Sequence, residues 1–462
     1  MFCDNSASTV TRVGPARAES LRGLCGGAVH LPEDPGYDTA RAPWNVAVDH
    51  HPAAVAYPAF PDEVAELLKA ACDAGLGVAT QGTGHGAAPF VGRLGDAVLL
   101  RTSAMTELTV ADGRARVGAG VLWGSVTDAA GALGLAGLHP STPDVGVIGY
   151  SLGGGISWYA RWAGLQSSAL TAVELVLADG TFVRCTETSE PELFWALRGG
   201  GGGLGVVTAV EFDLLPISTA VAGMLVWDWT AAEAVLPAWA AWAVVAPDEV
   251  TTSFRLLQAP DIPEVPADLR GRKLVVIDGA VVGPDALAAE VLAALRALRP
   301  ELDTFERVPA ATLAGLHLDP EGPAPGYARS SLMRDLPSEA IDALLSVVGP
   351  GSGSTLTVAE LRQLGGAVGR PDPRGGVLDR LDGSFLALGI GLDDDPGRYA
   401  QHIVEAGRLL DALAPWATGG HYLPMLDEEV ESRTGFPASS WSRLQAIRAA
   451  ADPHGLFVAQ HS

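Results

Sequence analysis

The sequence predicts a two-lobed protein that mixes helices with strands. The chain has 462 residues, several times the length of a typical small domain. In its first half, strand and helix patterns alternate with glycine-rich loops. Beyond Pro216 the glycine loops give way to longer alternating helix and strand patterns. We therefore place a domain boundary near residue 216.

The first elements follow the order strand, helix, strand, loop. Residues 1–34 have weak periodicity, and we interpret them as a loose arm followed by a short helix. Residues 55–58 predict a short strand, and residues 61–75 predict an amphipathic helix with a proline at its start and acidic residues in its first turn. A strand at 77–80 then leads directly into the glycine-rich segment 81–86.

From residue 97 the first lobe continues this alternation. Apolar and polar residues alternate as they do in β-hairpins, and Asp-Gly pairs mark the turns. The expected elements are, in order, strands within 97–122, a helix at about 123–134, a glycine-rich stretch at 143–155, a hairpin at 172–183, a glycine cluster at 199–203 and a strand at 205–212.

The composition argues against several classes of function. The net charge is −24, and a surface this acidic repels phosphate backbones, so nucleic acid is not an expected partner. No segment reaches the roughly 18 uncharged apolar residues of a membrane-spanning helix. The nearest, 232–247, contains Glu233 and Pro237 and predicts a buried or amphipathic helix. We expect no membrane association.

The cysteines and the N-terminus favour a cytoplasmic location. Cys3, Cys25, Cys72 and Cys185 are scattered, with neither a CxxC motif nor the spacing of zinc ligands. We expect free thiols in a reducing compartment and no metal site. The N-terminal segment lacks the basic and apolar regions of a secretory signal. The oligomeric state is not readable from the sequence.

The glycine clusters indicate a bound nucleotide cofactor. Glycine lets backbone N–H groups approach an anion closely and adopts positive φ without a steric clash. Segment 81–86 does not match the G-x-G-x-x-G fingerprint of an NAD site, and no Lys-Ser/Thr pair follows 153–155 as it would in a P-loop. Both of those nucleotide sites are therefore disfavoured, and the cofactor stays unnamed at this point.

Six motifs carry a family resemblance: Tyr37-Asp-Thr-Ala-Arg-Ala-Pro-Trp-Asn45, Thr80-Gln-Gly-Thr-Gly-His-Gly86, Gly146-Val-Ile-Gly-Tyr-Ser-Leu-Gly-Gly-Gly-Ile-Ser157, Glu192-Leu-Phe-Trp-Ala-Leu-Arg-Gly-Gly-Gly-Gly-Gly-Leu-Gly-Val-Val-Thr208, Leu364-Gly-Gly-Ala-Val368 and Asp452-Pro-His-Gly-Leu-Phe457. Together they resemble the FAD-linked oxidases of the vanillyl-alcohol oxidase superfamily, specifically its bacterial berberine-bridge-enzyme-like branch. The likeness spans roughly residues 35–460, and the Phe-Trp-Ala-Leu-Arg-Gly-Gly-Gly string is its most specific part.

The resemblance implies an α+β fold: a two-lobed PCMH-type FAD-binding domain plus a substrate domain whose antiparallel sheet is covered by helices. It implies FAD as cofactor, with His85 in the position of the family's histidine that bonds to the flavin 8α-methyl. The implied division is an N-terminal arm at 1–34, the FAD-binding domain at 35–215, the substrate domain at 216–418 and a C-terminal segment, 419–462, that returns to the FAD domain.

The resemblance also implies flavin contacts in the three glycine loops. Gln81 replaces a family arginine, and Thr142 stands where many relatives have a second, cysteinyl link, so a single covalent tether is expected. Val145 lies at the family's oxygen-gating position, where a small residue is associated with oxidases. The alternative interpretation is that Val145 is only a packed strand residue. The implied cofactor-binding residues are Gln81, Gly82, Thr83, Gly84, His85, Gly86, Thr142, Val145, Gly146, Gly149, Tyr150, Gly153, Gly154, Gly205 and Val207.

Tyr422 is the first candidate for the catalytic base, because it keeps the tyrosine of the family's Tyr-x-Asn-Tyr/Phe motif. The string Tyr422-Leu-Pro-Met425 has lost the asparagine and the second aromatic residue. A phenol would also need its pKa lowered from about 10 to act as a base. Glu360 is the second candidate, since Glu360 and Arg362 share one face of a predicted strand. Tyr150 and His139 flank the second glycine loop and are interpreted as pocket residues.

The implied activity is that of an FAD-dependent oxidase. A small organic substrate, such as an alcohol, a sugar or a secondary-metabolite intermediate, gives a hydride to flavin N5, and O₂ is then reduced to H₂O₂. Three alternatives stay open: a flavin dehydrogenase, a biosynthetic cyclase or tailoring enzyme, and a degenerate ligand binder without turnover. The sequence does not name the substrate, because one fold serves many functions.

Overall fold

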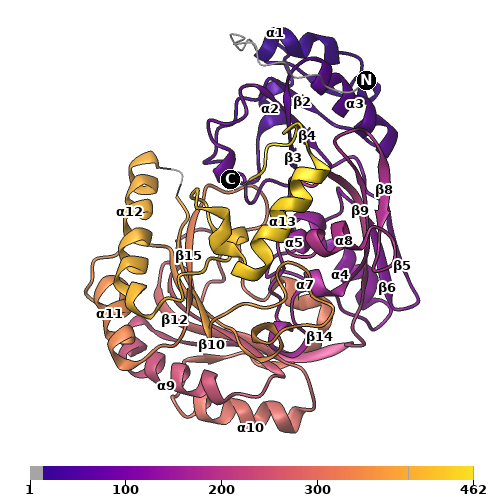
Figure 1. Cartoon of the computed structure of the whole chain (residues 1–462). Helices are drawn as coiled ribbons and strands as arrows, with labels where there is room; N and C mark the ends of the chain where they lie inside the picture. Colours follow the sequence, from indigo (N-terminus) through magenta and orange to yellow (C-terminus); the bar gives the residue numbers. More distant parts are fainter. Residues whose placement is uncertain (1–13, 394, 461–462) are drawn as a thin grey trace.

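The computed structural model describes residues 14–393 and 395–460. Two lobes are built around three β-sheets (Figure 1), two of them in the first lobe and the largest in the second. This arrangement confirms the predicted α+β fold with an antiparallel sheet in the second lobe. Of the predicted N-terminal arm, residues 1–13 lie outside the described residues.

The first sheet carries the first glycine loop at the end of one of its parallel strands. Its order is β1 (Val29–His30), β2 (Ala54–Ala56), β4 (Ala97–Arg101), β3 (Gly77–Gln81), and β2, β4 and β3 run parallel. Parallel neighbours need a crossover connection, which α3 (Pro61–Asp73) supplies between β2 and β3. The helix begins at Pro61, as predicted.

The second sheet is antiparallel and supports the other two glycine loops. Its order is β5 (Leu108–Ala111), β6 (Arg114–Gly118), β9 (Val206–Asp213), β7 (Leu170–Val176), β8 (Phe182–Cys185). The hairpin predicted at Asp179-Gly180 joins β7 and β8. Three helices pack on this sheet in one apolar core: α4 (Trp123–Gly131), α5 (Val147–Leu152) and α8 (Pro191–Leu197).

The third sheet forms the second lobe. It comprises β13 (Leu302–Asp303), β10 (Thr219–Asp228), β12 (Lys273–Val281), β11 (Val250–Gln258), β16 (Val358–Gln363), β17 (Phe385–Gly391) and β15 (Tyr327–Met333) in that order, with β14 (Glu306–Pro309) paired to β10. One face packs against the long helices on the outside of the molecule (Figure 1), so its other face is turned toward the first lobe. The long helices are α9 (Ala232–Val245), α10 (Asp285–Arg296), α11 (Ser338–Val348) and α12 (Pro396–Leu413).

The C-terminal segment returns to the first lobe. Helix α13 (Ala438–Ala451) lies against α8, and the chain then runs beside β3, where Val78 N donates to the Leu456 carbonyl and Val458 N donates to the Val78 carbonyl. No sheet strand lies between 213 and 219, the region of the expected boundary near 216. The exact domain limits stay a prediction. Four short helices complete the α-helices of the described residues: α1 (Gly14–Ala18), α2 (Tyr37–Arg41), α6 (Ala160–Ala163) and α7 (Gln166–Ala169).

The expectation for the thiols is wrong in part. Cys25 and Cys185 are free, as predicted, and burial raises the pKa of each thiol to about 12. Cys72, however, is disulfide-bonded, and Cys3 lies outside the described residues. Pairing depends on which distant cysteines the fold brings together, and sequence spacing does not report that.

Within the described part of the chain, no helix has both the length and the apolar character needed to cross a membrane.

Candidate flavin and substrate site

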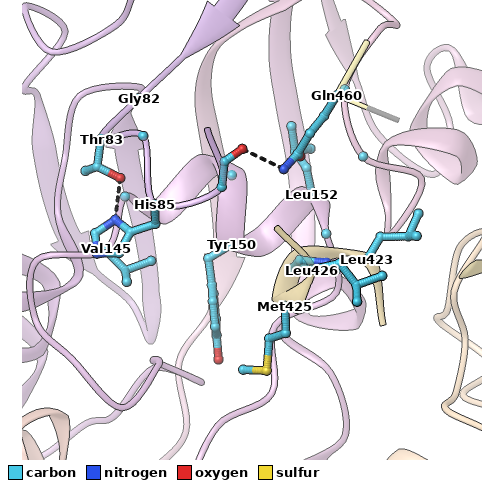
Figure 2. Close-up of a pocket in the computed structure, with 18 of the residues that line it drawn as sticks. Gly82, Thr83, His85, Val145, Tyr150, Leu152, Leu423, Met425, Leu426 and Gln460 are labelled. Carbon is cyan, nitrogen blue, oxygen red and sulfur yellow. Dashed lines mark hydrogen bonds between the residues drawn. The ribbon is translucent and has the colours of Figure 1, made fainter. Parts of the chain in front are cut away.

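A cavity of about 520 Å³ lies between the lobes, within the usual size of cofactor and substrate sites. The glycine loops, the inward face of the third sheet and the C-terminal segment line it, and Figure 2 shows part of the lining. Every predicted cofactor-binding residue except Gly154 reaches the cavity. Gly154, with φ +117°, instead packs against Tyr422, whose Cε2 would be 3.3 Å from an added Cβ.

The first glycine loop is held from both ends of the chain. Trp44 N donates to the Thr83 carbonyl, 2.9 Å away. Gly84 has φ +93°, and a Cβ there would lie 2.6 Å from Pro43 Cβ, so only glycine fits. From the other side, Gln460 Nε2 donates to the Gly86 carbonyl at 2.7 Å (Figure 2). The loop is therefore hydrogen-bonded to the rest of the protein on both of its sides.

His85 is oriented on the cavity wall by three neighbours. Its ring stacks on Trp44 with centroids 4.1 Å apart, and its Nδ1 lies 2.7 Å from Thr83 Oγ1 (Figure 2). Its Nε2 is 3.5 Å from Asp144 Oδ1, within ion-pair range, but has no hydrogen-bond partner among the described residues. The imidazole is thus fixed in place, with one nitrogen unsatisfied.

Asp144 was not singled out from the sequence, yet it organises this corner of the site. It accepts hydrogen bonds from Trp44 Nε1 at 2.6 Å and Thr142 Oγ1 at 2.8 Å. Burial alone would raise the pKa of its carboxyl, but the nearby His85 ring and the hydrogen bonds from Thr142, Trp44 and the Gly322 amide outweigh burial and hold the pKa well below its usual range. Asp144 is therefore a permanent anion beside His85.

The second and third glycine loops leave open space toward the cavity. An added Cβ at Gly149 on α5 would meet no heavy atom within 4 Å, and the same holds for Gly201 and Gly202. These glycines keep side chains out of the cavity rather than making room for neighbouring protein. A ligand can therefore approach their backbone closely.

Tyr150 lines the cavity as predicted, whereas His139 does not. The buried Tyr150 hydroxyl has no hydrogen-bond partner among the described residues, and burial raises its pKa well above the usual value. Figure 2 shows this hydroxyl directed away from the first glycine loop. His139 is buried beneath the loop, donates from Nδ1 to the Pro140 carbonyl at 2.8 Å, and has its pKa lowered by burial to about 4. It is a neutral core residue.

Tyr422 lies at the cavity, but its environment does not suit a base. Its hydroxyl accepts a hydrogen bond from Gly155 N at 2.9 Å. Burial raises its pKa to about 12, and the nearby Arg362 charge reduces that effect only in part. The phenol is therefore protonated at neutral pH, and its hydrogen has no acceptor among the described residues.

Glu360, the second candidate for the catalytic base, is not among the residues that line the cavity. Its buried carboxylate accepts from Arg362 Nε at 2.6 Å and from Ser253 Oγ at 3.0 Å. Burial opposes ionisation, but the charges of Arg362 and His317 outweigh burial and hold the pKa of Glu360 far below its usual range. Arg362, on the same face of β16, is the residue that reaches the cavity.

Glu360 belongs to a buried chain of alternating charges that the sequence interpretation missed. Asp278 pairs with Arg255 and lies 2.8 Å from His317 Nδ1, while His317 Nε2 lies 3.6 Å from Glu360. Burial and Arg255 lower the pKa of His317, but its acidic neighbours prevail and raise it to about 9. The available signal was Asp278, a charged residue in the apolar interior of strand β12.

Asp427 is another cavity residue that the sequence did not reveal. Its Oδ2 accepts from Ala328 N at 2.7 Å, and no hydrogen bond reaches its Oδ1 from the described residues. Burial raises the pKa of this carboxyl to about 7, despite the opposing hydrogen bond. Asp427 thus titrates near neutral pH at the edge of the cavity.

The comparisons with known proteins agree with this geometry. Residues 52–186 match a family described as an FAD binding domain. The chain is 34% identical over 203 residues to (R)-6-hydroxynicotine oxidase of Paenarthrobacter nicotinovorans, an alignment that covers only 44% of either protein. It is 25% identical over 449 residues to the uncharacterized FAD-linked oxidoreductase YgaK of Bacillus subtilis, covering 94% of this chain and 96% of YgaK.

Solved structures establish the fold. Physcomitrella patens BBE-like 1 superimposes with a TM-score of 0.84 at 20% identity, covering 96% of this chain and 98% of the other. The 6-hydroxy-D-nicotine oxidase from Arthrobacter nicotinovorans gives a TM-score of 0.80 at 23% identity, covering 93% and 96%. The chain therefore contains an FAD binding domain at residues 52–186 and has the fold of these two solved structures.

Proposed function

We propose that the protein is an FAD-dependent oxidase that acts on a small organic substrate and uses O₂ as electron acceptor. One observation carries the proposal: three glycine loops and an oriented histidine converge on a single cavity that is closed by a sheet from the other lobe. Bound FAD supplies the acceptor for a hydride. The names of relatives, including the nicotine, glucooligosaccharide and xylooligosaccharide oxidases, support oxidation as the reaction class.

The residues of the cavity fit FAD. Gly149, Gly201 and Gly202 leave open space that a flat ring or a phosphate chain would fill. Backbone amides of the loops at 82–86 and 199–205 would hold the pyrophosphate, because the arginine expected in the first loop is Gln81. Gln81 Oε1 accepts from Arg101 Nη1 at 2.7 Å. The loop therefore keeps a cation nearby, on the neighbouring strand β4.

We further propose a single covalent link, through His85. The imidazole is held on the cavity wall by Trp44 and Thr83 and presents a nitrogen without a hydrogen-bond partner. Thr142 has no thiol, and its hydroxyl is already bonded to Asp144. A second link of the cysteinyl kind is therefore chemically impossible at this position.

The proton acceptor of the reaction must titrate near the working pH and lie within reach of the substrate. Tyr422 and Tyr150 do not meet the first condition, and Glu360 does not meet the second. We propose Asp427, which lines the cavity and has a pKa of about 7. Replacing Asp427 with Asn should remove the limb near pH 7 from the profile of kcat/KM and leave bound flavin unchanged.

The first test is the absorbance spectrum of the purified protein before and after acid precipitation. A yellow precipitate in the wild type, and a colourless one in His85→Ala, is the expected result for a covalent flavin. Flavin released into the supernatant would cancel the link at His85 but keep the flavoenzyme. A protein that is colourless and cannot be loaded with FAD would overturn the proposed function.

Peroxide formation separates the oxidase from the alternatives. Turnover with stoichiometric H₂O₂ is expected, whereas activity with artificial dyes but no H₂O₂ would favour a dehydrogenase. Thr142→Ala is the matched control for His85→Ala, because it alters the same corner of the site without touching His85.

The predicted cytoplasmic location stays a prediction, and the disulfide at Cys72 counts against the reducing environment on which it was based.

A further inference from the structure

The substrate half of the cavity combines one cation from the third sheet with mainly apolar walls and with two carboxylates, Asp319 and Asp427. Arg362 on β16 reaches the cavity from the third sheet, and it is the cation that the sheet presents there. The neighbouring lining is aliphatic or thioether in character: Leu378, Leu388, Ile390, Leu392, Leu423 and Met425. A polyhydroxylated ligand would leave most of its hydroxyl groups without partners against such walls.

Arg362 is held so that part of its guanidinium stays available. Its Nε donates to Glu360 at 2.6 Å and its Nη2 to the same carboxylate at 3.4 Å. Its Nη1 donates to none of the described residues. Arg161 shows the contrast: this buried arginine uses every one of its nitrogens on backbone carbonyls, including those of Val250 and Ala246. Arg161 holds structure together, whereas Arg362 keeps donors free at the cavity.

The charge behind Arg362 is not fully neutralised within the buried chain. Glu360 lies between two cations, Arg362 and the protonated His317, and Asp278 likewise lies between His317 and Arg255. Three cations thus share two carboxylates within the chain. Asp319 lines the cavity, accepts from Ser141 Oγ at 2.8 Å and adds a negative charge that acts on both Arg362 and His317. Arg362 forms no ion pair with Asp319, so its Nη1 is left for a ligand.

Two hydroxyl donors accompany Arg362. The buried Tyr150 hydroxyl has no partner. The Tyr422 hydroxyl accepts from Gly155 N, but its own hydrogen has no acceptor among the described residues. Arg362 affects the pKa of both phenols, so all three groups lie within electrostatic range of one another. A guanidinium and two protonated phenols are the donors that an oxygen anion requires.

We propose that Arg362, Tyr150 and Tyr422 form an anion subsite in the substrate half, and that the substrate is a mainly apolar molecule with one acidic oxygen group. A carboxylate, an acidic phenol and an enol share this chemistry. The inference rests on the proposed function for the identity of the reaction. It goes further because it selects apolar acids over the neutral oligosaccharides that some relatives are named for.

The test compares the full chain's binding of 2-naphthoate and of its neutral isostere 2-naphthamide. Equilibrium dialysis measures binding whether or not flavin is present, and a shift of the flavin absorbance reports it when flavin is bound. The acid should bind at least tenfold more tightly than the amide. In Arg362→Met the affinity for the acid should fall by about 10- to 100-fold, because a charged hydrogen bond is lost, while the amide is unaffected.

Tyr150→Phe is the second variant, needed because Arg362→Met also unbalances Glu360. This change removes one unpartnered hydroxyl and should weaken acid binding several-fold, with no effect on the amide. Arg370→Met is the matched control: its guanidinium is exposed and paired with Asp248, outside the cavity, and no change is expected.

Two outcomes would overturn the inference. The first is equal or tighter binding of the amide by the wild type, or no binding of either compound. The second is unchanged acid binding in both cavity variants. Absence of flavin with acid preference intact would instead defeat the proposed function and leave the anion subsite standing.

Discussion

The two halves of the cavity are built in opposite ways. The flavin half consists of three continuous loops whose shape depends on their own glycines, although Trp44 and Gln460 hold the first loop from distant parts of the chain. The substrate half takes its groups from separate strands and from the C-terminal segment, with Arg255 and Asp278 contributing to the charge chain from β11 and β12. The first half depends on backbone shape, whereas the second depends on balanced charge. The two halves should therefore fail differently when mutated.

The largest expected effect is in the charge chain. Glu360→Ala leaves Arg362 and the protonated His317 buried without their shared anion, so the free energy of unfolding should fall by about 3–5 kcal/mol. Urea denaturation measures this. Glu192→Ala, which breaks an exposed ion pair with Arg443, should change stability little. Equal losses in the two variants would show that the buried chain is no more important than surface pairing.

The next two variants separate glycines that the backbone of the flavin half requires from glycines that leave space for the cofactor. Gly84→Ala places a Cβ 2.6 Å from Pro43 at φ +93°, and should lower the free energy of unfolding by roughly 2–3 kcal/mol. Gly149→Leu meets open space, so stability should hold. In the His85→Ala background, where no covalent link retains the flavin, FAD should bind on the order of tenfold more weakly. Thermal unfolding and flavin retention distinguish the two. A Gly149→Leu protein that retains FAD fully in that background would show that the loop does not face the cofactor.

A smaller effect comes from Asp427 and concerns the pH dependence of the free energy of unfolding. Its pKa is about 7 in the fold and near 4 when unfolded. Between these values the unfolded chain binds fewer protons, so this residue lowers stability as pH rises from about 4 to 7. Asp427→Asn should remove that contribution, at most about 2 kcal/mol between pH 5 and pH 7. Denaturant titrations of both proteins at the two pH values test it, and parallel pH slopes would contradict it.

The smallest expected effect concerns the rate at which the enzyme reacts with O₂. Val145 lines the cavity at the start of the second loop, and Val145→Leu should slow oxygen-dependent turnover roughly tenfold, about 1.4 kcal/mol in barrier. Dye-dependent turnover should change less. Val145→Ala is the control, and it should not slow the oxygen reaction. If both variants behave as the wild type does, Val145 is merely a packed residue.

The sequence predicted the flavin half well, because its information is local. A loop such as 81–86 carries its glycines and histidine in one string, and the structure places all of these residues at the cavity. The strand and helix order of the first lobe was confirmed for the same reason. Even here Asp144 escaped notice, since its role comes from Trp44 and His85, which are distant in sequence.

The substrate half was predicted poorly in its chemistry. Tyr422 and Arg362 do lie at the cavity, but the burial that raises the pKa of Tyr422 comes from the tertiary structure. Glu360 was placed correctly on the face of Arg362, yet the direction of its carboxylate depends on Ser253 and His317, from other parts of the chain. One sequence signal was overlooked: Asp278 interrupts the otherwise apolar strand β12.

The bond between Gln460 and Gly86 joins residues 374 positions apart. Because a ribosome makes the chain from its N-terminus, the first glycine loop exists long before the segment that covers it. The cavity can close only after residue 460 has been synthesised. The wall that the C-terminal segment supplies is therefore the last part of the cavity to be made, and a chain truncated before α13 should hold FAD less tightly than the full chain.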